Sequence, residues 1–252
     1  MGSEARHFTP DLPASVMVLS LVVLGLFAGV LTTIAGMGGG TLLLLVLSLA
    51  MDPKMALACT APALLVSNAH RLYLFRAHLN RRVALAFALG ALPGSLVGGL
   101  LVSWVSPSWV RWAMLGTTLL AIAQAQGILR WKPPAAAILP AGFLVGVVAA
   151  TAGGAAALVG PLLMATGLRG SPYIATVAAC GVAMHVGRST AYSAAGLVND
   201  TTVFYSAILT ATLMLGNLLG RRLRQSMKES TATRIELASL LICMALALVG
   251  VT

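Results

Sequence analysis

Long apolar runs separated by short polar turns occupy the chain from residue 14 to its end. Eight runs are long enough to be membrane-spanning helices, at approximately 14–35, 54–76, 83–104, 109–130, 135–152, 172–197, 201–220 and 233–251. Two shorter runs, 41–51 and 155–168, would extend only ~16–20 Å as helices, against a hydrocarbon thickness of ~30 Å. The pattern predicts an all-α polytopic membrane protein with about eight long transmembrane helices. The two short runs are expected to be half-helices, strongly tilted or re-entrant.

The chain also repeats itself with a shift of 117 positions. Gly29-Val30, Ala35-Gly36, Ala58, Ala61 and Arg71 recur as Gly146-Val147, Ala152-Gly153, Ala175, Ala178 and Arg188. In each copy an apolar run stops at a cluster of small residues and is followed by one of the short runs. Interrupted hydrophobic segments in both halves are typical of secondary transporters, whose binding sites lie where the interruptions meet. We expect an extramembrane segment 1–13, a first repeat 14–132 and a second repeat 133–252.

The composition places this chain in lipid. Hydrophobic residues make up 59% of it and charged residues only 9%, whereas a soluble domain carries roughly 25% charged residues. The net charge of +10 would suit a nucleic-acid-binding protein, but its distribution argues against one. Arginines gather in short loops at 71–82, 130–132 and 221–228, as they do in the cytoplasmic loops of membrane proteins. The expected surroundings are therefore a lipid bilayer, with no nucleic acid partner.

The loop charges also predict the topology. With the three basic loops in the cytoplasm, the weakly charged loops near 103–108 and 199–200 lie outside, and so do both termini. Each repeat then crosses the membrane an odd number of times, so the two halves have opposite orientations. This is an inverted repeat. A parallel repeat is the alternative, and it would require the second basic loop to lie outside.

A capping residue followed by proline is expected to open the third segment of each half. Asp52-Pro53 and Ser171-Pro172 occupy matching places in the two copies. Aspartate and serine side chains accept hydrogen bonds from the first backbone amides of a helix, and proline is tolerated in the first helical turn.

The small-residue clusters are candidate substrate-binding segments. Their glycines are Gly36, Gly38, Gly39, Gly40, Gly153 and Gly154. Backbone that leaves the helical conformation inside a membrane must be buried in protein or line a wet cavity. An unwound segment followed by a short helix offers free amides and a positive dipole end, which attract anions. Close helix packing through small residues is the alternative interpretation.

Arg188 is the leading binding candidate. It lies 16 positions after Pro172, ~14–15 Å from the outer end of its segment at helical rise. An arginine at that depth costs at least ~2.5–3.5 kcal/mol. The six acidic residues lie at or near segment ends, so backbone carbonyls or an anionic ligand are left to neutralise it.

Three further side chains accompany Arg188. Arg71 is its equivalent in the first copy but lies nearer a helix end, where a positive-inside anchor is an equally good interpretation. His185 and Asn68 each precede one of these arginines by three positions and share its helix face. His185 can bond substrate oxygens or carry a proton, or it is a histidine of the core.

Other polar residues carry weaker signals. Cys59, Cys180 and Cys243 lack metal-ligand spacing, and no nucleophile has a base placed to serve it. We therefore expect neither an enzyme nor a cofactor or metal. Tyr73 and Tyr192 are interpreted as packing or interfacial residues. The minor binding candidates are His70, Gln124, Gln126 and Asn217.

The stretches from Gly29 to Arg71 and from Gly146 to Arg188 resemble the TauE/SafE sulfite-exporter family. That family has two copies of an apolar segment, a glycine-rich break, a short run, and a third segment with small and polar residues. This chain departs from it in having Leu42 to Leu47 in place of a proline-containing run, and Ala155-Ala156 where glycines are usual. The resemblance implies a multi-pass transporter of a bacterial cell inner membrane. Its substrates would be sulfite, sulfoacetate or related organosulfonates, moved by a proton or by the membrane potential.

Two other functions remain compatible with this fold. One is an anion channel, and the other is a membrane-embedded assembly or regulatory protein that does not transport. The direction of transport, the coupling ion and the oligomeric state stay open at this stage.

Overall fold

The computed structural model describes residues 13–36, 38–125, 128, 134, 137–153 and 156–249, and every regular element within them is helical. Each long apolar run forms a helix. These are α1 Ala14–Ala35, α3 Pro53–Phe75, α4 Arg81–Leu101, α5 Pro107–Ala125, α6 Ile138–Ala152, α8 Gly170–Ala194, α9 Asp200–Ser226 and α10 Glu229–Val249. The two short runs form α2 Gly39–Ala50 and α7 Ala156–Ala165, and a 3₁₀ turn η1 covers Arg76–His78.

The outer helices of this bundle have the character of membrane spans. Within the described ranges, α1, α4 and α9 are long and apolar enough to cross a membrane, judged by length and composition. Their outward faces carry large apolar side chains: Leu19, Leu89 and Leu215 are 63%, 68% and 56% exposed. Such continuous apolar surface is stable only against lipid or another apolar surface. The chain is therefore a multi-pass membrane protein.

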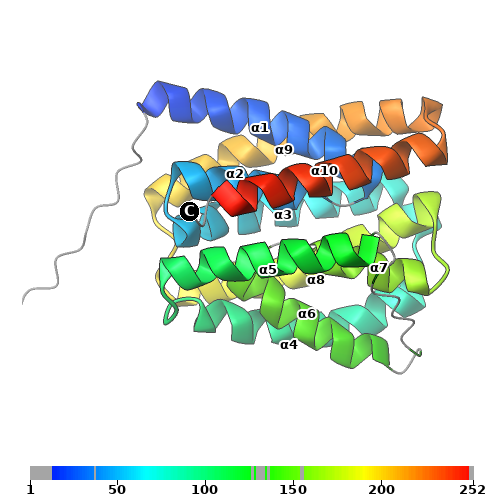
Figure 1. Cartoon of the computed structure of the whole chain (residues 1–252), viewed down its shortest axis with the longest axis horizontal. Helices are drawn as coiled ribbons and strands as arrows, with labels where there is room; N and C mark the ends of the chain where they lie inside the picture. Colours follow the sequence, from blue (N-terminus) through cyan, green and yellow to red (C-terminus); the bar gives the residue numbers. More distant parts are fainter. Residues whose placement is uncertain are drawn as a thin grey trace, which may run out of the picture.

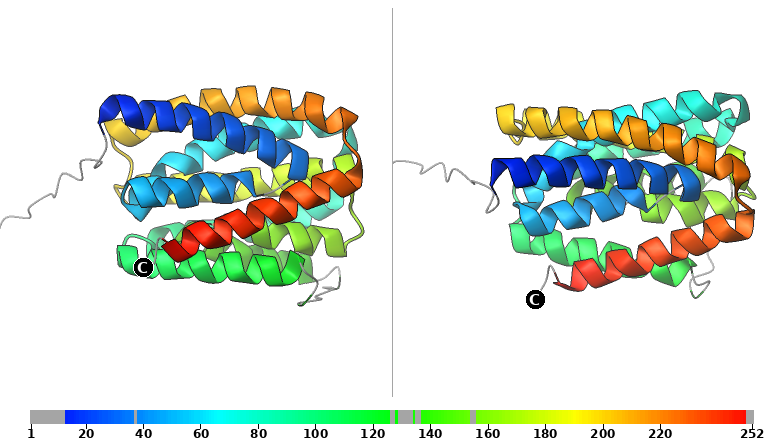
Figure 2. Two further views of the ribbon diagram at one scale, coloured as in Figure 1. Left: turned by 45° about the horizontal axis from the view of Figure 1, so that its top comes forward. Right: turned by 90° about the horizontal axis from the view of Figure 1, so that it is seen from above.

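Helices α3 and α8 form the centre of the bundle. They pack against each other, with α1 and α9 beyond α3 and with α4 and α6 beyond α8 (Figure 1). Helices α5 and α10 pack together and cover the short helices α7 and α2 (Figure 2). The two helices that carry the buried arginines Arg71 and Arg188 are in this way flanked by other helices on both sides.

Glycines set the closest helix contacts. On α4, a Cβ atom at Gly94 would collide with the backbone carbonyl of Phe143 in α6. On α9, a Cβ atom at Gly216 would collide with the carbonyl of Leu26 in α1. Association of helices in lipid depends on such close backbone approach.

Each short helix follows a break in the backbone. Gly36 ends α1 with φ +85°, and Gly38 precedes α2 with φ +94°. Gly153 ends α6 with φ +67°. Residues with a Cβ rarely adopt these left-handed conformations, and glycine does so at little steric cost. The break predicted in each half is present at Gly36 and at Gly153.

The two predicted caps have different outcomes. Asp52 accepts hydrogen bonds from the amides of Lys54 (2.8 Å) and Met55 (3.3 Å), so the first cap is confirmed. The prediction for Ser171 is wrong. Helix α8 already begins at Gly170, which places Ser171 inside the first turn, where its side chain cannot cap the helix.

The ends of the bundle differ in charge. Helix α1 begins and α10 ends at one end, whereas the arginine-rich segments 76–82 and 221–228 lie at the opposite end (Figure 1). The third basic segment, 130–132, falls outside the described residues.

Candidate functional site

A cavity lies in the middle of the bundle, at the contact between α3 and α8 and next to both helix breaks. It encloses about 590 Å³ of space not filled by atoms, its opening included. The lining residues are Thr32, Gly36, Gly40, Thr41, Leu44, Leu64, Asn68, Arg71, Ala149, Val159, Val177, Gly181, Met184, His185 and Arg188. The four polar side chains singled out from the sequence on α3 and α8 are all among them.

Arg71 is anchored to the end of α1. Its Nη1 atom donates to the carbonyl oxygens of Thr32 (2.7 Å) and Gly36 (3.1 Å), and its Nη2 atom donates to Asn68 Oδ1 (2.6 Å). The last carbonyls of a helix have no partner within the helix, so a buried cation there satisfies them. Asn68 is fixed in turn, because its Nδ2 atom donates to the Leu64 carbonyl (2.8 Å). Arg71 therefore joins α3 to the first helix break.

Arg188 has a different set of partners. Its Nε atom donates to the hydroxyl of Tyr192 (3.3 Å), and its Nη1 atom lies 3.5 Å from Nδ1 of His185. The side chain is only 3% exposed. Its Nη2 atom is buried and has no hydrogen-bond partner within the described part of the chain. A guanidinium held this way keeps a free donor at the cavity.

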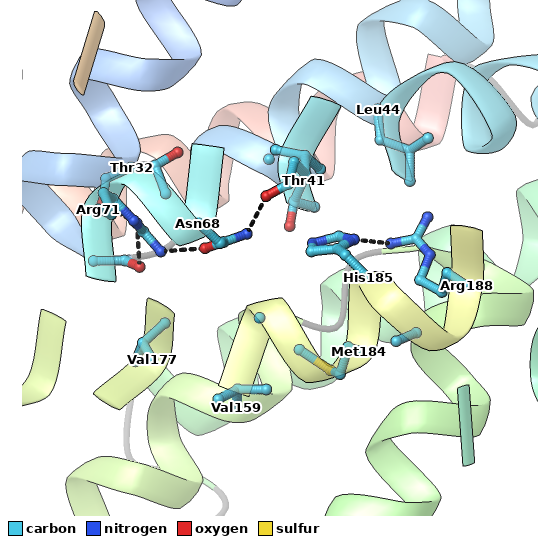
Figure 3. A pocket seen from close by; sticks show the side chains of 15 residues that line it. Thr32, Thr41, Leu44, Asn68, Arg71, Val159, Val177, Met184, His185 and Arg188 are labelled. Carbon is cyan, nitrogen blue, oxygen red and sulfur yellow. Dashed lines mark hydrogen bonds between the residues drawn. The ribbon is translucent and has the colours of Figure 1, made fainter. Parts of the chain in front are cut away.

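The two pairs face each other across the cavity. Figure 3 shows Arg71 with Asn68 on one side and Arg188 with His185 on the other. Two guanidinium groups line this cavity, and none of the described lining residues is acidic. A desolvated cation favours an anionic neighbour, and guanidinium is suited to groups that present two oxygens. The cavity is therefore chemically suited to a small oxoanion.

The start of α2 adds to this character. Gly40 and Thr41 in its first turn line the cavity, and the Thr41 hydroxyl is buried without a hydrogen-bond partner in the described structure. The positive end of a helix dipole and the free amides of a first turn both favour anions. The N-terminus of α2 thus supports the same charge preference as the arginines.

The glycines named from the sequence do not all reach the cavity. Gly36 and Gly40 line it. Gly38 lies beside Ser239 of α10, Gly39 packs on α1 at Thr32, and Gly153 packs against Leu44. Gly154 lies outside the described residues.

Some contributions were not evident from the sequence. Tyr192, interpreted there as a packing or interfacial residue, is fully buried and bonded to Arg188, so the interfacial interpretation is wrong. Its place one helical turn after Arg188 was the available signal. Thr41 was not singled out, although a hydroxyl in the first turn of a half-helix is a recognisable feature.

The minor candidates lie elsewhere. Asn217 is buried on α9, where it bonds Thr33 of α1 and Ser67 of α3, so it joins three helices away from the cavity lining. His70 lies 3.5 Å from the Asn217 amide and is also absent from the lining. The side chains of Gln124 and Gln126 are outside the described structure.

Comparison with known protein families gives one match. The family model described as "Sulfite exporter TauE/SafE" matches residues 21–248, which include both helix breaks and every residue that lines the cavity. No curated protein and no solved structure matches the chain. With about nine-tenths of its length covered by the family model, the chain belongs to the TauE/SafE family of sulfite exporters.

Proposed function

We propose that this protein transports small sulfur oxoanions, namely sulfite, sulfoacetate or related organosulfonates, and binds them in the central cavity at Arg188. The observation that carries the proposal is the buried Nη2 atom of Arg188, which has no hydrogen-bond partner among the described residues. A sulfonate or sulfite group offers several oxygens that accept from a guanidinium. Family membership supports the same substrate class.

The remaining cavity residues are assigned supporting roles. The His185 ring, beside the Arg188 guanidinium, can donate to a substrate oxygen or carry a proton with the anion. Thr41 supplies a hydroxyl from the first turn of α2. Arg71 adds positive charge to the cavity, while its Nη atoms stay on the α1 carbonyls and on Asn68.

We further infer that the halves form an inverted repeat. A shift of 117 positions relates Leu26 to Phe143, and these two carbonyls are the ones approached by Gly216 and Gly94. The same shift relates the break at Gly36, whose amide donates to Thr32 O (2.9 Å), to that at Gly153, whose amide donates to Ala149 O (3.0 Å). In Figure 1 α1 and α6 run in opposite directions, which favours an inverted relation over a parallel one.

The proposed location is the inner membrane of a bacterium, with the arginine-rich end of the bundle in the cytoplasm. Positive loops are retained on the cytoplasmic side during insertion. The start of α1 and the end of α10 then lie on the outer side. The proposed topology is therefore that of a multi-pass protein with both termini on the outer side.

Ligand-dependent stabilisation of the purified protein tests the substrate class. A ligand that binds only the folded state raises the midpoint of thermal unfolding. We expect a rise with sulfite and sulfoacetate and a smaller one with acetate; sulfate and taurine complete the panel. Arg188→Lys keeps the charge but loses the planar fork, and should weaken binding by at least ~1–2 kcal/mol. Arg82→Lys, on the exposed first turn of α4, is the matched control.

Transport itself separates this function from its rivals. In proteoliposomes a transporter exchanges labelled substrate against unlabelled substrate and accumulates label by counterflow. An anion channel of the same fold would dissipate the gradient without counterflow. A protein that bound none of the five compounds would instead fit the assembly or regulatory role.

A further inference from the structure

The two arginine motifs differ at both flanking positions, and at the second of these only the α8 motif carries a hydroxyl group. Asn68, Arg71 and Phe75 lie along one face of α3, and the shift of 117 positions places His185, Arg188 and Tyr192 along the matching face of α8. Phenylalanine has no hydrogen-bonding group, whereas tyrosine has a hydroxyl that both donates and accepts. The arginine next to Phe75 is bonded to backbone carbonyls, whereas the arginine next to Tyr192 bonds no backbone carbonyl of the described residues.

Tyr192 is held in place by three helices. It belongs to α8, its hydroxyl donates to the carbonyl of Ala150 near the end of α6, and its ring lies over Gly99 of α4. The side chain is fully buried. The same hydroxyl accepts from Nε of Arg188, whose guanidinium carbon lies 5.6 Å from the ring centroid. Arg188 is therefore bonded to a fixed oxygen.

Arg71 shows where Arg188 would turn without that oxygen. The carbonyls that Arg71 binds are those of Thr32 and Gly36, and their equivalents at the end of α6 are those of Ala149 and Gly153. A buried guanidinium gains from any acceptor within reach, because an unmade hydrogen bond in low dielectric is costly. Loss of the hydroxyl would free Nε and favour rotation of Arg188 toward those carbonyls.

We infer that Tyr192 is a positioning residue for the anion site: its hydroxyl holds the Arg188 guanidinium toward the cavity and keeps the second half from adopting the carbonyl-bonded arrangement of Arg71. The inference rests on the proposed function, since it concerns how Arg188 reaches its anion. It also gives the two halves separate tasks. The first half anchors its arginine to the fold, and the second half presents its arginine to the ligand.

Calorimetric titration of the purified full chain with sulfoacetate tests this inference. Tyr192→Phe removes one oxygen and keeps the ring, so the variant should stay folded. We expect its Kd to rise about ten-fold, the effect of one misplaced charge-assisted hydrogen bond, with the number of sites per folded protein unchanged. Tyr205→Phe is the matched control, because it makes the same change at a buried tyrosine of α9 that does not line the cavity.

A double-mutant cycle with Arg188→Lys separates positioning from packing. If Tyr192 acts through Arg188, adding Tyr192→Phe to Arg188→Lys should raise the Kd by less than two-fold, because lysine has no Nε donor to be misplaced. Additive losses, or fewer sites with unchanged Kd, would identify Tyr192 as a packing residue and overturn the inference. Wild-type affinity in Tyr192→Phe would also overturn it, whereas the loss in Arg188→Lys would still support the proposed function. Absence of binding by the wild-type protein would contradict both this inference and the proposed function.

Discussion

The guanidinium of Arg71 donates to the backbone carbonyl of Thr32 over 2.7 Å and ties α3 to the last turn of α1. Its equivalent Arg188 bonds no α6 carbonyl directly and leaves Nη2 unpaired within the described structure. Two arginines at matching places thus have different partners. Arg71 bonds the carbonyls at the end of α1, whereas Arg188 has a donor left for a ligand.

This difference predicts effects of different size from the same substitution. Arg71→Met leaves the Gly36 carbonyl and Asn68 Oδ1 without the donor that Arg71 supplies, while the Thr32 carbonyl keeps the Gly36 amide. It should lower the free energy of unfolding by roughly 2–5 kcal/mol, because each buried group left unpaired costs about 1–3 kcal/mol. Arg188→Met removes an incompletely bonded charge. It should leave ligand-free stability within about 1 kcal/mol of wild type. Thermal unfolding in detergent without added anions measures both, and equal losses would contradict the distinction.

The glycine contacts predict a second pair of matched effects. Gly94→Ala and Gly216→Ala force a methyl group against a backbone carbonyl of the neighbouring helix, and overpacking of this kind costs about 1–3 kcal/mol. The two losses should be similar, because the added Cβ would lie 2.1 Å from a carbonyl oxygen at Gly94 and 2.3 Å from one at Gly216. Gly116→Ala on α5 is the control, since a Cβ there meets no atom within 4 Å. It should stabilise the helix by roughly 0.5–1 kcal/mol. Destabilisation by Gly116→Ala alone would contradict this account of the packing.

Much of the architecture could be predicted because lipid imposes a simple rule on sequence. Spanning helices need long apolar runs, so the runs at 14–35 and 83–104 nearly coincide with α1 and α4. The breaks at Gly36 and Gly153 were visible for the same reason, since small residues interrupt otherwise continuous apolar segments. Helix positions and breaks are local properties of the chain.

The partners of the arginines could not be predicted from local patterns. Whether Arg71 meets a carbonyl or a ligand depends on where the end of α1 lies relative to α3, a contact between residues 39 positions apart. The hydroxyl of Tyr192 reaches Ala150 across 42 positions. The failed cap at Ser171 is a smaller example, because the start of α8 depends on the backbone conformation at Gly170.

The topology gives a third prediction. Reporter fusions after Thr252 should be active only on the outer side of the membrane, and fusions within 79–82 only in the cytoplasm, because basic loops are retained inside. A cytoplasmic reporter signal after Thr252 would contradict the proposed inverted repeat.

Energetics give a fourth prediction. Each negative charge that leaves a cell with an inside-negative potential of ~100 mV gains ~2.3 kcal/mol, roughly a 50-fold gradient. A sulfonate anion can therefore be exported without a coupled ion. In proteoliposomes loaded with labelled sulfoacetate, efflux should accelerate when the inside is made negative.

Insensitivity to voltage would indicate a proton carried with the anion. Efflux would then respond to acid on the substrate side, and His185 is the titratable group that lines the cavity beside Arg188. His185→Gln should abolish that acid response. A response that survived the substitution would exclude His185 as the proton carrier.

The ionisable side chains that line the cavity are all basic, and this has a consequence for zwitterions. Taurine carries the same sulfonate group as sulfoacetate, but its other end is an ammonium. Among the described lining residues no carboxylate is available to pair with that ammonium, whereas two guanidinium groups repel it. The carboxylate of sulfoacetate is attracted by the same two guanidinium groups. The absence of an acidic side chain from the described lining thus lets the cavity discriminate between two molecules of nearly equal size. Such discrimination depends on unfavourable contacts with the excluded molecule as well as on favourable contacts with the bound one.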